Sequence, residues 1–141
     1  MVNQQDFYGW TQQQISLLRS RQFDEIDWEG LIEEVESMGN SELRELESRL
    51  TVLLMHLLKW QYQANLQTRS WILTIKEQRR RIVKRLQQSP SLKSKLGEII
   101  ADAYEIAKGD AADETGLSES NFPIKCPWTY TQIVDMEFLP K

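Results

Sequence analysis

The sequence contains very little cysteine and histidine: Cys126 and His56 are the single residues of these types among 141. One cysteine cannot form an internal disulfide, which fits a reducing compartment and makes the cytoplasm the expected location. The common zinc frameworks need four cysteine or histidine ligands, so they are excluded. The sequence therefore indicates no zinc framework, and we expect no cofactor.

Long hydrophobic runs are also missing. The longest candidate, residues 52–58, contains His56 and is far shorter than the roughly 20 residues that span a bilayer. Gln4, Gln5 and Asp6 stand where the apolar core of a signal peptide would lie. Strand-length alternation, internal repeats and low-complexity segments are absent. We therefore expect no membrane partner and no sheet.

The strongest pattern in the chain is helical periodicity. An apolar content of 40% and a charged content of 27% fit one globular domain with a real core. Residues 41–63 predict a central helix, which is apolar nearly all round between Thr51 and Trp60 and should be buried. Val52 and Met55 lie opposite its main stripe and need a second packing partner, which is the tail, the fifth predicted helix (after Ser89-Pro90) or a second copy. The stripe consists of Leu43, Leu46, Leu50, Leu53, Leu54, Leu57 and Trp60.

Four further segments predict helices. They are residues 7–20 after Asp6, 28–38 after Asp27, 70–88, and a helix after Ser89-Pro90 that ends at Gly116. The helix at residues 28–38 has an apolar face that should pack in the core. The Gly39-Asn40 turn should make this helix an antiparallel neighbour of the central helix. That face consists of Trp28, Leu31, Ile32, Val35 and Met38.

The predicted fold is all-α: a single-domain bundle of about five main helices over residues 6–116. An irregular C-terminal segment, residues 117–141, should wrap over it and carry one short helix at 129–135. The apolar tail, Phe138-Leu139-Pro140, should pack against the bundle. Core packing is the better interpretation for Trp10, Trp28, Trp60 and Trp71. Trp128 is the candidate for a functional role, and Cys126 is expected to be an inert thiol.

Charge is unevenly distributed along the chain. Residues 24–47 hold ten acids and one base, a net charge of −9, whereas residues 59–95 hold ten bases and one acid, a net charge of +9. The preferred interpretation is that the acidic helix at residues 28–38 and the basic helix at residues 70–88 lie close together and compensate each other's charge. The alternative is a nucleic-acid patch, which lacks interleaved aromatic residues for base stacking. Its residues would be Lys76, Arg80, Arg81, Lys84 and Arg85.

One polar constellation falls among the apolar positions. Gln78 and Arg79 point into the buried sector of their helix, and a buried guanidinium keeps its charge and needs acceptors. We predict that Arg79 pairs with Glu36 or Glu34, and that His56 and Gln78 join the same hydrogen-bonded cluster. The alternative is that Arg79 extends to water at the edge of the stripe. The cluster should fix helix register; a metal or small-molecule site is the second interpretation.

Several short motifs, taken in order, resemble the bacterial domain-of-unknown-function family 29. The resemblance covers essentially the whole chain and implies a small all-helical bacterial domain, with no established activity, cofactor or partner. The motifs are Asp6-Phe7 with Trp10, Leu31-Ile32-Glu33-Glu34-Val35-Glu36 with Gly39, His56-Leu57-Leu58-Lys59-Trp60-Gln61-Tyr62, Trp71, Gln78-Arg79, Ser89-Pro90-Ser91-Leu92, Ala103-Tyr104, Glu114-Thr115-Gly116-Leu117, Phe122-Pro123 and Cys126-Pro127.

The sequence favours a non-catalytic interaction or regulatory module that binds an unknown protein partner or a second copy. Two alternatives stand beside it. One is a metal-dependent or hydrolytic enzyme that uses Glu34, Glu36, His56 and Arg79. The other is nucleic-acid binding through the basic helix at residues 76–85. The Glu-x-x-His repeat of di-iron bundles, a catalytic triad and a phosphate-binding glycine loop are all absent from the sequence.

Overall fold

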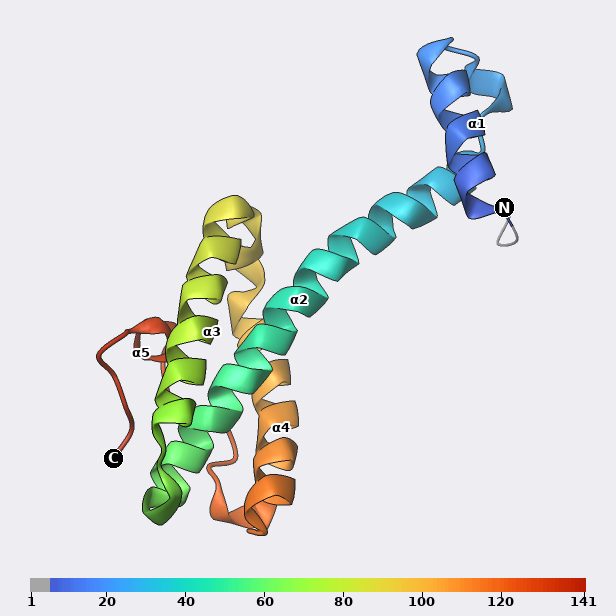
Figure 1. The fold of residues 1–141 in the computed structure, drawn as a ribbon. Helices are drawn as coiled ribbons and strands as arrows, with labels where there is room; N and C mark the ends of the chain where they lie inside the picture. Colours follow the sequence, from blue (N-terminus) through green and yellow to red (C-terminus); the bar gives the residue numbers. More distant parts are fainter. Residues whose placement is uncertain (1–5) are drawn as a thin grey trace. The chain divides into compact units, whose positions relative to one another are not determined.

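The computed structural model describes residues 6–141, and that part of the chain is helical or irregular, with no strand (Figure 1). The prediction of an all-α fold is confirmed, including the short helix near the C-terminus. Short 3-10 turns connect the longer elements. The five α-helices are α1 (Phe7–Arg19), α2 (Trp28–Tyr62), α3 (Arg69–Gln88), α4 (Leu96–Thr115) and α5 (Tyr130–Val134).

Helix α2 differs most from the prediction. It is one continuous helix of 35 residues, so the predicted second helix and the predicted central helix are a single element. Gly39 and Asn40, where a turn was expected, are helical, and Gly39 lacks the positive φ that a helix-ending glycine adopts. The predicted antiparallel hairpin is therefore wrong. Gly116 does take the left-handed conformation, with φ of 75°, and ends α4 as predicted.

The chain divides into two compact units, Met1–Glu42 and Leu43–Lys141. Helix α2 crosses the boundary between them. We call these units 1 and 2. The grouping of both into one domain stays a prediction.

Unit 1 is a small helical element that hydrogen bonds around Asp27 hold together. One carboxylate oxygen of Asp27 caps α2 by accepting from the backbone N–H of Gly30 (3.0 Å), and the other accepts from Nε1 of Trp10 (2.9 Å). The buried Gln14 accepts from the backbone N–H of Asp27 at 2.8 Å. A Cβ at Gly30 would come within 2.8 Å of the Trp10 ring, so glycine permits this close approach. Polar bonds thus fix a unit that has little core of its own.

Unit 2 contains the main hydrophobic core. The C-terminal half of α2 supplies fully buried leucines, as predicted, and α3 and α4 flank it (Figure 1). Met55 packs against this core, so the internal partner predicted as one alternative exists for that side chain. The buried core residues are Leu46, Leu50, Leu53, Leu54, Leu57, Leu58, Ile75, Ile82, Leu86, Ile99, Ala103, Tyr104, Ala107, Ala111, Phe122, Trp128 and Ile133.

The segment after α4 is folded onto unit 2. Phe138 and Leu139 pack against the core, which confirms that the tail is packed. The hydroxyl of Tyr104 donates to the carbonyl of Pro123 at 2.7 Å, and the ring of Phe122 meets Tyr62 edge-on. This arrangement leaves the C-terminal segment in a position to meet α3.

Candidate functional site

Arg79 is the most buried charged residue in the part of the chain that the structure describes, with 1% of its surface exposed. Its Nε donates to the carbonyl of Ile133 (2.7 Å), and its Nη2 donates to the carbonyls of Phe138 (2.8 Å) and Gln132 (3.4 Å). Burial lowers the pKa of Arg79, and the charge of Asp135 opposes that shift. The predicted burial is confirmed, whereas extension into water is wrong.

The acceptors of Arg79 are not the predicted ones. They are backbone carbonyls of α5 and the tail, so this cation ties the C-terminal segment to α3. Glu34 and Glu36 belong to unit 1, whereas Arg79 and its three acceptors belong to unit 2. Three carbonyl dipoles accept from Nε and Nη2 of the guanidinium, which helps to explain how the charge is buried without a carboxylate in hydrogen-bond contact.

His56 and Gln78 also have partners other than the predicted ones. Nδ1 of His56 donates to the carbonyl of Val52 at 2.8 Å, one turn earlier on α2. Burial lowers the pKa of His56, so the imidazole is neutral at pH 7. Gln78 accepts from Arg49 through its side-chain oxygen at 3.3 Å. The contacts among residues 6–141 thus do not join these side chains to Arg79 in one cluster.

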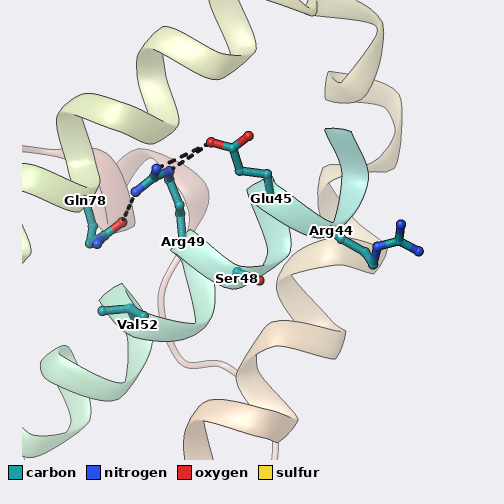
Figure 2. A pocket seen from close by; sticks show the side chains of 6 residues that line it. All are labelled: Arg44, Glu45, Ser48, Arg49, Val52 and Gln78. Carbon is teal, nitrogen blue, oxygen red and sulfur yellow. Dashed lines mark hydrogen bonds and ion pairs between the residues drawn. The ribbon is translucent and has the colours of Figure 1, made fainter. Parts of the chain in front are cut away.

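Gln78 instead lies in an open cleft between α2 and α3, which we call the arginine cleft (Figure 2). Arg49 reaches from Gln78 to the Glu45 carboxylate, whose other oxygen lies 2.6 Å from Nη2 of Arg85. The hydrogen bond from Arg85 lowers the pKa of Glu45. The cleft has a volume of about 350 Å³ and is lined by Arg44, Glu45, Ser48, Arg49, Val52 and Gln78.

The central carboxylate of this cleft already has two guanidinium partners. The arrangement is therefore better described as a polar cross-link between α2 and α3 than as a preformed anion site. Figure 2 shows Arg44 extending away from the group formed by Glu45, Arg49 and Gln78. The pair between Glu45 and Arg85 joins one acid of residues 24–47 to one base of residues 59–95. Glu45 lies outside the predicted acidic helix at residues 28–38, so charge compensation between that helix and the basic helix stays a prediction.

Of the five predicted nucleic-acid residues, four are exposed to solvent and three form ion pairs, including Arg85 with Glu45. Arg80 and Arg81 form ion pairs with Glu77 on the same helix. Lys76, Arg80 and Lys84 are exposed to solvent, at a spacing of four residues along α3. We call the row that contains them the basic stripe of α3. It comprises Arg69, Leu73, Lys76, Arg80 and Lys84, all exposed.

A second cavity, of about 510 Å³, lies between α4 and residues 125–128. Cys126 donates its S–H to the carbonyl of Trp128 at 3.5 Å, and burial raises the pKa of this thiol. Trp128 is itself buried in the core. A thiol that stays protonated at neutral pH is a poor nucleophile, so the cavity contains no activated cysteine.

An apolar face in unit 1 is open to solvent. It lies on the N-terminal part of α2, where the exposed fractions are 50% for Trp28, 54% for Ile32, 64% for Val35 and 67% for Met38. The prediction that this face packs in the core is wrong. Helical periodicity predicted that these residues share one face, and the exposed fractions show that this face is open to solvent. We call this surface the unit 1 face.

An acidic row borders the unit 1 face. At about 100° per residue, Glu29, Glu33 and Glu36 follow one flank of the apolar residues, and all three are exposed. Unit 1 carries nine acids and two bases, a net charge of −7, and unit 2 carries fifteen bases and twelve acids, a net charge of +3. The unit 1 face is thus an exposed apolar surface with a strongly negative border.

Among the described residues, no group of three or more His, Cys, Asp or Glu side chains is placed to hold a metal ion. No helix between residues 6 and 141 combines the length and the apolar character that a membrane crossing requires.

The sequence predicted only part of the unit 1 face and of the contacts that Arg79 and Glu45 make. The apolar residues of the unit 1 face were recognised as one stripe, but the stripe alone did not show whether it was covered. The carbonyl acceptors of Arg79 have no sequence signal, because every residue carries a backbone carbonyl. Only the opposite charges of their two segments indicated that Glu45 could pair with Arg85.

Taken together, these features define a small all-helical protein in which one long helix is shared by two compact units. The chain belongs to the family described as Domain of unknown function DUF29, which matches residues 2–139. This confirms the resemblance found in the sequence. No curated protein and no solved structure matches the chain.

Proposed function

We propose that this protein is a non-catalytic interaction module that binds a protein partner through the unit 1 face. The observation that carries the proposal is the exposure of four large apolar side chains on one side of α2. Isolated exposed apolar residues are ordinary, whereas a contiguous apolar patch is typical of an interaction site. An amphipathic helix that presents apolar residues at this spacing fits a helix-in-groove contact.

The charge of the border defines the chemistry of the partner. Glu29, Glu33 and Glu36 would meet the rim of the bound surface, so that surface should have an apolar centre and a basic edge. The alternative of an enzyme has less support. Nδ1 of His56 and Nε and Nη2 of Arg79 donate to backbone carbonyls, and burial raises the pKa of Cys126.

Photo-cross-linking in cells tests this proposal. A benzophenone amino acid at position 35 should form a discrete covalent adduct with a protein, and the cross-linked peptide should carry a net positive charge. The same residue in place of Tyr8, an exposed aromatic of α1, is the matched control and should give no adduct. An additional Ile32→Glu change should abolish the adduct at position 35. The absence of any adduct there, or an acidic cross-linked peptide, would contradict the proposal.

A further inference from the structure

We infer that the occupant of the unit 1 face is a second copy of this chain, which contributes the basic stripe of its α3. This inference rests on the proposed function and names the partner. It starts from the charge balance. Unit 1 carries a net charge of −7, and the residues with the opposite sign are concentrated on the solvent side of α3 in unit 2.

The two surfaces match in length and pattern. The acids of the unit 1 face stand at positions 29, 33 and 36, and three of the exposed cations of α3 stand at 76, 80 and 84, of which Arg80 also pairs with Glu77. At 1.5 Å of rise per residue, the two rows are each about 10–12 Å long. Leu73 and the aliphatic stems of the lysine and arginine side chains can cover apolar side chains, and a cation can lie over the ring of Trp28.

A contact between two unit 1 faces fits less well. Pairing one unit 1 face with the unit 1 face of its symmetry mate would place the acidic rows of both copies beside each other, where like charges repel. A contact between a unit 1 face and a basic stripe removes that repulsion. In a pair with two-fold symmetry this contact forms twice, which doubles the buried area.

A second copy fits the charge pattern of this chain. Each copy carries both the acidic row of the unit 1 face and the basic stripe of α3, so two copies offer each other complementary surfaces.

The test uses two charge-reversed variants of the full chain. The arm variant carries Glu29→Lys, Glu33→Lys and Glu36→Lys. The stripe variant carries Lys76→Glu, Arg80→Glu and Lys84→Glu. All six positions are exposed, so both variants should fold, which circular dichroism and thermal melting will check.

Sedimentation equilibrium then measures self-association of the purified proteins. The wild type should be dimeric. Each variant alone should bind itself at least about 100-fold more weakly, because two like-charged contacts replace two favourable ones. An equimolar mixture of the variants should recover the dimer, since each of its two contacts again joins opposite charges.

Three results would overturn the inference. They are a wild type that is monomeric at all concentrations, a stripe variant that dimerises like the wild type, and a mixture that stays monomeric. The second result would indicate pairing between unit 1 faces. A monomeric wild type that still forms the adduct at position 35 in cells, with a different protein, would overturn this inference and leave the proposed function intact.

Discussion

At the scale of single residues, Arg79 connects two parts of unit 2 that are distant in the sequence. Its guanidinium lies on α3, and its three acceptors lie in residues 132–138. Removing a charged donor leaves buried carbonyls without a partner, and each lost bond to a charged group is worth about 1.5–3 kcal/mol. Arg79 therefore has a structural role, which is to hold the C-terminal segment against the bundle.

We expect Arg79→Met to lower the free energy of unfolding by about 2–4 kcal/mol and to release the C-terminal segment. Urea unfolding measures the first effect, and hydrogen exchange of residues 130–139 measures the second. The control is Arg80→Met at the next position, which is exposed and should change stability by less than about 0.5 kcal/mol. Equal effects of the two substitutions would show that the three carbonyl bonds do not stabilise the fold.

His56 gives a prediction about pH. Burial lowers its pKa in the folded state below the ordinary value of 6.5, so the unfolded chain takes up the proton first as the pH falls. The contribution of His56 to stability is complete above about pH 6.5 and is lost as the pH falls through its folded pKa. Between about pH 7.5 and 5.5 the wild type should lose more stability than His56→Gln. Parallel pH profiles for the two proteins would contradict this account.

At the scale of elements, α2 shows why the sequence analysis succeeded in one place and failed in another. The stripe of leucines in its C-terminal half predicted a buried core helix correctly, because periodicity reports which side chains share a face. The same kind of pattern in its N-terminal half predicted burial wrongly. Periodicity does not report what covers a face, and Gly39-Asn40 is compatible with both a turn and a helix.

The continuity of α2 is testable at Gly39. No atom lies within 4 Å of a Cβ placed there, and the backbone is helical. Gly39→Ala should therefore raise the free energy of unfolding by about 0.5–1 kcal/mol. If Gly39 instead formed a left-handed turn, Gly39→Ala would lower the free energy of unfolding.

Gly116 provides the matched control for that substitution. It also has no atom near its missing Cβ, but its φ of 75° is left-handed. Gly116→Ala should therefore lower stability by about 1–2 kcal/mol. Chemical denaturation of both variants compares the two backbone conformations with the same change of side chain.

At the scale of the whole molecule, composition and periodicity predicted an all-helical fold, the ends of α1 and α3, and the packed tail. Long-range partners were less predictable. Arg79 binds carbonyls that carry no sequence signal, and Gln78 meets Arg49, a residue that its helical pattern did not mark. Charge asymmetry identified opposite segments, but only the structure shows that an exposed apolar face accompanies the acidic one.

The central claim is that the unit 1 face is covered by a second copy in solution. Hydrogen–deuterium exchange at increasing protein concentration measures this directly. The account predicts that amides of residues 28–38 and of residues 69–84 become more protected as concentration rises. Amides of residues 99–111 in α4 should exchange at a constant rate. Exchange at residues 28–38 that is independent of concentration would contradict the claim.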